Sequence, residues 1–138
     1  MAVLPSGLTV QNRPEYSLKD ATGFSHIYLK IGYTDLRKGI PGLTLLIKES
    51  FGLDPYEDDS LFLFCGRRSD RIKGLCFEGD GFCLVYKKLQ SDGRFQWPRS
   101  EDDLREITAQ QFKWLMEGLT ISPKKHISDI KCKPTQLI

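Results

Sequence analysis

Apolar residues along the chain first follow a two-residue period and then a helical one. In "HIYLKIG" they alternate with Tyr28 and Lys30, which is typical of a strand with one buried face. From Thr34 onward they recur every three or four positions as far as Phe51. This second pattern predicts a helix that ends near Gly52.

Proline in this second segment leaves two possibilities for the helix. Within a helix, Pro41 would remove a hydrogen-bond donor and produce a kink. Alternatively, a short first turn over residues 35–38 precedes a main helix that has Pro41 at its first position. Either Thr34 or Asp35 can cap the start.

Three further strands are expected at residues 61–65, 72–78 and 82–88. Between the last two, Asp80-Gly81 is a strong hairpin signal because glycine tolerates a positive φ. The three strands therefore form an antiparallel meander. The stretch "SEDDLRE" that follows is interpreted as an acidic linker.

The stretch "ITAQQFKWLMEGL" predicts a second helix with clear boundaries. Thr108 and Gln111 form a capping box at its start, and Gly118 is placed to end it. Trp114 projects away from the apolar face and is expected to be exposed or to face a partner. The apolar face consists of Phe112, Leu115, Met116 and Leu119.

These elements predict a small α+β domain, in which an antiparallel sheet of about four strands packs against two helices. We expect a flexible N-terminal arm at 1–24, one domain at 25–121 and a basic flexible tail at 122–138. No apolar run approaches the roughly 20 residues needed to span a bilayer, and the N-terminus lacks the pattern of a signal peptide. The expected location is the cytoplasm.

Positive charge is concentrated in the middle of the chain. The formal net charge is only +2, but eight lysine and arginine residues oppose four acids between positions 61 and 99, a local excess of +4. Pairing of the two hairpin strands would bring Lys87 and Lys88 beside Arg71 and Lys73. The candidate nucleic-acid-binding residues are Arg67, Arg68, Arg71, Lys73, Lys87, Lys88 and Arg94.

Simpler explanations of these residues stay open. Lysine and arginine are common at exposed turns and strand edges, where they discourage aggregation. Asp70 can pair with a neighbouring arginine. Phe95 and Trp97 can either stack on bases or anchor their segment to the core.

No catalytic or metal-binding motif is present, so we expect neither an enzyme nor a cofactor. The four cysteines lack a CxxC spacing, and only two histidines accompany them. Buried thiols therefore explain the cysteines better than zinc ligands do. The acids of "LDPYEDDS" can in principle hold a metal, although a solvated turn is the simpler interpretation.

Five stretches occur together in one order: "GYTDLRKGIPGL", "LFLFCGRRSDRIKGL", "EGDGFCLVYKKL", "GRFQWP" and "ITAQQFKWLMEGL". In order and spacing they resemble the TnpB-type accessory proteins, the second open reading frame products of insertion sequences of family sixty-six. The likeness runs from about Ile27 to Ile121. The chain is not similar to the far longer RNA-guided nuclease that shares the TnpB label.

The resemblance implies a bacterial mobile-element protein that acts beside a separate, larger transposase, and it supplies no catalytic residue to carry over. Two features depart from the family pattern, namely Pro41 and the run from Cys76 to Glu78. The matching motif positions are Thr34, Asp35, Arg37, Lys38, Gly39, Gly42, Arg67, Arg68, Asp70, Arg71, Lys73, Asp80, Gly81, Tyr86, Lys87 and residues 94–98.

Two functions follow as hypotheses. In the first, the protein is a non-catalytic accessory factor in transposition that binds DNA through the basic hairpin. In the second, it is an adaptor that docks on the transposase or on another accessory protein through Trp114 and acidic surfaces, without touching DNA. The sequence leaves the oligomeric state open.

Overall fold

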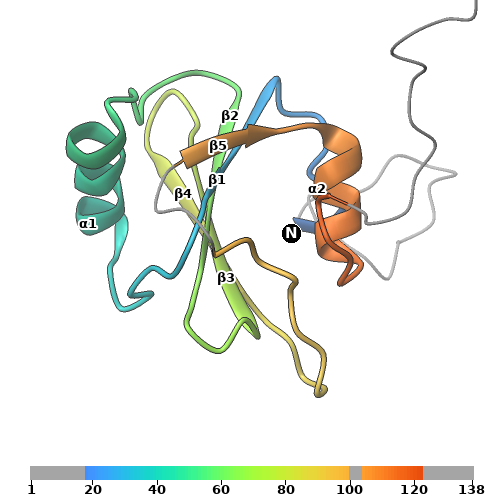
Figure 1. The fold of residues 1–138 in the computed structure, drawn as a ribbon. Coiled ribbons are helices and arrows are strands. Elements are labelled where there is room, and N and C mark those ends of the chain that lie inside the picture. The colour runs from blue at the N-terminus through green and yellow to red at the C-terminus, as the bar shows by residue number, and fades with distance from the viewer. Residues whose placement is uncertain (1–17, 100–103, 123–138) are drawn as a thin grey trace, which may run out of the picture.

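A five-stranded mixed sheet carries one α-helix on each face (Figure 1). The structure, a computed structural model, describes residues 18–99 and 104–122. The strand order is β4-β3-β2-β1-β5. The strands are β1 (His26–Lys30), β2 (Ser60–Cys65), β3 (Arg71–Phe77), β4 (Phe82–Lys88) and β5 (Leu104–Ile107). The helices are η1 (Leu18–Asp20), α1 (Ile40–Leu45), η2 (Leu46–Ser50) and α2 (Ala109–Met116).

The central strand β2 is buried at all six positions because both faces of the sheet are covered. Its side chains alternate between two apolar clusters. The cluster on the α2 side includes Leu29, Leu61, Leu63, Cys65, Ile72, Phe112 and Leu115. The cluster on the α1 side includes Leu43, Ile47, Phe62, Phe64 and Leu75.

The predicted α+β class is confirmed, while the sheet is larger than expected and not wholly antiparallel. Strand β1 pairs parallel to β2, since the segment that contains α1 crosses over between them. The stretch interpreted as an acidic linker contributes β5, which pairs antiparallel to β1 at the edge of the sheet. The strands predicted at 61–65, 72–78 and 82–88 lie within one residue of their expected bounds, and β1 covers the first five residues of the stretch "HIYLKIG".

The first helix follows the second of the two possibilities for Pro41. A turn in which the Lys38 amide donates to the Asp35 carbonyl (3.1 Å) precedes α1, which starts at Ile40 with Pro41 in its first turn. The expected cap by Thr34 or Asp35 is wrong, since Gly39 is the N-cap and makes no side-chain cap bond. The helix continues through the π-helical turn η2 and ends before Gly52, whose φ is +64°.

The β3–β4 hairpin is confirmed, but its turn is centred one residue earlier than predicted. The Glu78 amide donates to the Gly81 carbonyl at 2.8 Å, so that Gly79 and Asp80 are the two central residues. Gly79 has a φ of +92°. Glycine at the first central position is typical of a type II′ turn, whose twist suits a hairpin.

Helix α2 agrees with its sequence signals. The Thr108 hydroxyl accepts from the Gln111 amide, and the Gln111 side chain accepts from the Thr108 amide, which completes the capping box. Gly118 follows the helix with a φ of +83°. Three of the four residues predicted for its apolar face are buried. The prediction is wrong for Leu119, which follows the end of the helix and is half exposed.

The predicted flexible ends lie mostly outside the described residues. Of the arm at 1–24, residues 18–24 are described, and Leu18 packs into the cluster on the α2 side. The predicted tail is described only at Ser122. Within the described part of the chain, no helix is long and apolar enough to cross a membrane.

Candidate nucleic-acid interface

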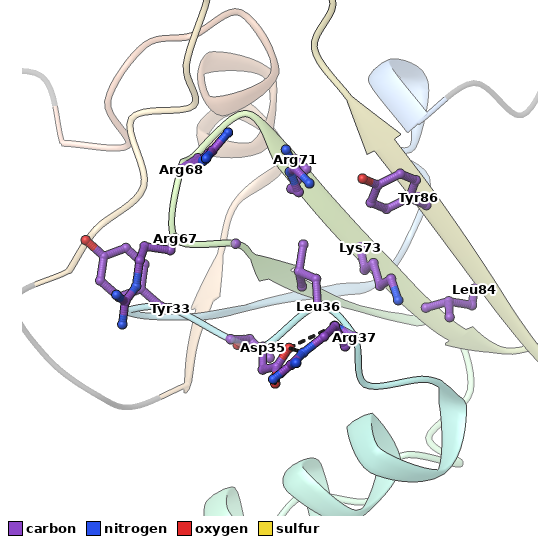
Figure 2. Close-up of a pocket in the computed structure, with 12 residues that line it drawn as sticks. Tyr33, Asp35, Leu36, Arg37, Arg67, Arg68, Arg71, Lys73, Leu84 and Tyr86 are labelled. Atoms are coloured by element: carbon purple, nitrogen blue, oxygen red, sulfur yellow. Dashed lines mark hydrogen bonds and ion pairs between the residues drawn. The ribbon is translucent and has the colours of Figure 1, made fainter.

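An open groove of about 1080 Å³ lies on the α1 side of the sheet, at the end where β2 passes into β3 (Figure 2). Three segments that are far apart in the sequence line it: the loop after β1, the β2–β3 connection, and β3 with β4. Its lining residues are Tyr33, Thr34, Asp35, Leu36, Arg37, Gly66, Arg67, Arg68, Arg71, Lys73, Leu84 and Tyr86.

Because β1 pairs parallel to β2, both strands end at the same edge of the sheet, and the two segments that follow them lie next to each other. The Thr34 amide donates to the Cys65 carbonyl at 2.9 Å, which fixes the loop after β1 against the end of β2. Gly66 closes the β2–β3 connection by donating to the Arg71 carbonyl at 3.1 Å. A Cβ at Gly66 would lie only 3.1 Å from the Arg71 side chain, so this close approach favours glycine.

Five cations and one carboxylate line the groove. Asp35 binds the guanidinium of Arg37 through both oxygens, at 3.0 Å to Nε and 2.8 Å to Nη2. These hydrogen bonds and one from the Arg37 amide lower the pKa of Asp35 to about 2. The lining cations are Arg37, Arg67, Arg68, Arg71 and Lys73. The groove is therefore strongly positive at neutral pH.

Arg71 also has a carboxylate partner beside the groove. Its Nε donates to Oδ1 of Asp70 at 2.9 Å, which confirms the prediction that Asp70 pairs with a neighbouring arginine. The hydrogen bond lowers the pKa of Asp70 and raises that of Arg71. Because the contact with Asp70 uses only part of the guanidinium, other N–H donors of Arg71 remain available to a ligand.

The register of the hairpin divides the predicted cations between two faces. Arg71 lies opposite Lys88 and Lys73 opposite Tyr86, so these residues share the α1 side. Lys87 lies opposite Ile72, which belongs to the cluster on the α2 side. Burial, and to a lesser degree Lys19, lower the pKa of Lys87. Lys87 is thus separated from the groove by the sheet.

Arg94 is also outside the groove. It is exposed, and its Nη1 donates to the carbonyls of Asp92 and Gly93 in its own turn, at 3.2 and 2.9 Å. Of the seven predicted binding residues, four line the groove, and Lys88 lies next to one of them in the register.

Phe95 and Trp97 anchor their segment, and neither is available for stacking. Both are almost fully buried, and Nε1 of Trp97 donates to the Lys30 carbonyl at 2.8 Å. The Phe95 amide donates to the Ser69 carbonyl at 2.7 Å. This segment, residues 94–98, therefore supports the β2–β3 connection and is called the supporting segment below.

Arg99 links this supporting segment to the groove. Its Nη2 donates to the Ser69 hydroxyl, and its guanidinium carbon lies 3.7 Å from the centre of the Tyr33 ring. Ser69 has a left-handed backbone, with a φ of +61°. Arg99 thus holds both the turn that carries the arginines and an aromatic ring at the groove.

Tyr33, Arg37 and Tyr86 line the groove but were not among the predicted site residues. The sequence resemblance includes Arg37 and Tyr86 as motif positions, which was the available signal for them. Tyr33 stands in the first of the quoted stretches but is not one of the motif positions, and it reaches the groove through the pairing of β1 with β2.

On the other face of the sheet, two thiols and a carboxylate lie close together. The ligand atoms of Cys76, Glu78 and Cys83 are within 4.8 Å of one another. Burial, together with the neighbouring Cys83 and Glu78, raises the pKa of Cys76 to about 11. Cys76 therefore keeps its proton at neutral pH, which agrees with a packing role for this residue.

Trp114, the predicted partner-facing residue, is neither fully exposed nor part of the core. It lies on α2, whose buried residues are Phe112, Leu115 and Met116. A role in partner binding stays a prediction.

Comparison with known proteins identifies the family. The profile described as "IS66 Orf2 like protein" matches residues 25–126. The chain belongs to this family. Membership indicates an accessory protein in transposition, as the sequence motifs predicted.

Two proteins of Sinorhizobium fredii are similar to this chain. The uncharacterized protein y4hO is 37% identical over 93 residues, which cover 67% of this chain and 79% of y4hO. The uncharacterized protein y4jC is 34% identical over 85 residues, which cover 62% of this chain and 71% of y4jC. No solved structure matches the chain significantly.

The groove coincides with the motifs that carry the family resemblance. Eight of its twelve lining residues are motif positions, drawn from the loop after β1, the β2–β3 connection, β3 and β4. The supporting segment, residues 94–98, is a further motif. The fold therefore assembles separate motifs of the IS66 Orf2 like proteins around one surface.

Proposed function

We propose that the protein is a non-catalytic accessory factor in DNA transposition that binds DNA through the groove. The observation that carries the proposal is the meeting of five cations from separate segments in one concave surface. Lysine and arginine side chains that contact phosphates displace condensed counterions, which gives affinity without sequence readout. This type of binding suits an accessory protein that works beside a transposase.

A further feature supports a phosphate ligand. Nε of Arg71 donates to Asp70 at 2.9 Å, which fixes the direction of the guanidinium and leaves other donors for a ligand.

The test compares two variants that lose the same charge from different places. Arg67→Gln/Arg68→Gln removes two groove cations, while Lys87→Gln/Arg94→Gln removes two cations outside it. Fluorescence anisotropy with a labelled DNA is measured across a salt series, and circular dichroism melts check the fold. We expect the first variant to bind at least about tenfold more weakly, with a salt slope shallower by about 0.9 for each phosphate that is no longer neutralised.

The control variant should bind nearly as the wild type does. Absence of measurable binding by the wild type at low salt would refute the proposal. An equally large decrease in affinity for both variants would show that net charge matters and the groove does not.

A further inference from the structure

Two exposed tyrosine rings lie on opposite sides of the groove. Tyr33 comes from the loop after β1 and Tyr86 from β4, with the arginines of the β2–β3 connection between them (Figure 2). Their side chains are 47% and 51% exposed. Large aromatic side chains are usually more buried than this, so the exposure of two of them at one groove calls for an explanation.

Cations lie beside both rings. Arg99 is 3.7 Å and Arg67 5.7 Å from the centre of the Tyr33 ring, measured from the guanidinium carbon. Nζ of Lys73 is 6.0 Å from the centre of the Tyr86 ring. An aromatic surface bordered by phosphate-binding groups is the combination that single-stranded nucleic acid requires, because each nucleotide offers both a base and a phosphate.

Among the described residues, a third exposed tyrosine provides a contrast. Tyr56 contacts the rings of Phe77 and Phe82, with centroid distances of 5.1 and 5.0 Å, so packing accounts for its position. The ring contacts of Tyr33 and Tyr86 are with cations. Packing against apolar neighbours therefore explains Tyr56 better than it explains the two groove tyrosines.

The backbone of both groove tyrosines is fixed in the absence of a ligand. Nζ of Lys30 donates to the Tyr33 carbonyl at 3.2 Å, and the next residue is bonded to Cys65. Tyr86 lies within a paired strand, opposite Lys73. A ring on a fixed backbone loses little conformational entropy when a base stacks on it.

We infer that the groove binds single-stranded DNA, with bases stacked on Tyr33 and Tyr86 and phosphates held by the cations between them. The inference rests on the proposed function and specifies its ligand. In a duplex the base faces are already stacked on one another, so the two rings would contribute little. An unpaired strand can use both kinds of contact at once.

The experiment compares three ligands of equal length: an oligothymidine, a mixed-sequence duplex, and a strand in which the central bases are replaced by abasic sites. The abasic strand keeps its phosphates and lacks the bases that would stack. Binding is measured by fluorescence anisotropy with the full chain. The variants are Tyr86→Ala, Tyr86→Phe and the control Tyr56→Phe, and circular dichroism melts verify that each is folded.

Wild-type protein should bind the oligothymidine about tenfold more tightly than the abasic strand. Tyr86→Ala should lose about tenfold in affinity for the oligothymidine and little for the abasic strand, with an unchanged salt slope. Tyr86→Phe, which keeps the ring, and Tyr56→Phe should bind as the wild type does.

The possible failures are distinguishable. Equal binding of the oligothymidine and the abasic strand, or an unchanged affinity for Tyr86→Ala, would refute the stacking inference. Preference for the duplex would also refute it and would leave the proposed DNA-binding function standing. If none of the three ligands bound, both would fail.

Discussion

Asp35 is the one carboxylate among the residues that line the groove. It stays ionised at neutral pH because Arg37 lowers its pKa to about 2. Its charge therefore offsets one of the five cations, and it repels a phosphate that approaches them. It also accepts from the Arg37 amide at 3.0 Å through Oδ1, so part of its role is to shape the turn.

Asp35→Asn should increase affinity for DNA. Asparagine keeps the Oδ1 acceptor for the Arg37 amide and removes the negative charge, so the turn persists while Arg37 becomes available to phosphate. We expect binding to tighten about fivefold at low salt, measured by fluorescence anisotropy. Asp80→Asn, in the β3–β4 turn, is the matched control and should have little effect. Weaker binding by Asp35→Asn would show that the aspartate positions Arg37 for its ligand.

His26 provides a prediction about pH. Its Nδ1 lies 2.7 Å from Oε2 of Glu106, and this hydrogen bond raises the pKa of His26 above its usual value. Because the pKa of His26 is higher in the folded state than in the unfolded state, the folded state is more stable when His26 is protonated. The contribution to stability is therefore fully present below about pH 6.5 and disappears as the pH rises through the raised pKa.

Glu106→Gln should lower the pKa of His26 toward its ordinary value, as measured by NMR titration of the imidazole. The variant should unfold more easily than the wild type near pH 6 and equally easily near pH 9. Glu117→Gln, which removes an exposed carboxylate that follows α2, serves as the control. An unchanged His26 pKa in Glu106→Gln would contradict the pairing.

At the scale of the elements, local patterns predicted most of the fold. The β3–β4 hairpin and α2 have strong signals of their own, namely a turn glycine and a complete capping box. Strand β5 has only four residues, of which Arg105 and Glu106 are exposed. It becomes a strand because β1 provides a partner, and such long-range pairing leaves little trace in local sequence.

The site could be predicted only in part, for the same reason. The cations of the β2–β3 connection are adjacent in sequence, so their cluster was visible. Arg37 and Tyr33 reach the groove through the parallel pairing of β1 with β2, which no local pattern specifies. Because side chains alternate between the two faces along a strand, Lys87 lies on the face opposite to the groove. Assigning it to that face required the register of the hairpin, which the sequence alone does not give.

Helix α1 depends on a few residues for its docking on the sheet. Leu43 of α1 and Ile47 of the following turn η2 are fully buried against Phe62 and Phe64, whereas Leu45 of α1 is 53% exposed. Leu43→Ala should lower the free energy of unfolding by about 2–5 kcal/mol, measured by urea denaturation. Leu45→Ala removes the same atoms from the exposed face and should change stability by about 0.5 kcal/mol or less. Equal effects would contradict the described packing of α1.

The capping box of α2 gives a smaller effect. Thr108→Ala removes the hydroxyl that accepts from the Gln111 amide at 3.1 Å. We expect the free energy of unfolding to fall by about 1 kcal/mol in the same denaturation assay. Thr120→Ala, at an exposed position beyond the helix, is the control. A decrease no larger than that of the control would mean that α2 is fixed by its buried face alone.

At the scale of the whole molecule, opposite charges lie at opposite ends of the sheet. Acids gather where β1 and β2 begin, and the groove cations gather where the two strands end. The six residues of β2 span roughly 20 Å between these ends. At the acidic end lie Asp54, Glu57, Asp58, Asp59 and Glu106. Such a charge distribution orients the molecule as it approaches a polyanion.

The acidic end should influence how fast DNA binds without affecting the bound state. Asp54→Asn/Asp58→Asn removes two charges that lie far from the groove, so the effect must act through the long-range field. We expect stopped-flow association to be about twofold faster at roughly 0.01 M salt, where the Debye length is about 30 Å, and unchanged at roughly 0.15 M, where it is about 8 Å. The dissociation rate should be the same as that of the wild type at both salt concentrations. A change in dissociation, or an effect that persists at the higher salt, would mean that DNA reaches the acidic end and that the bound strand extends well beyond the groove.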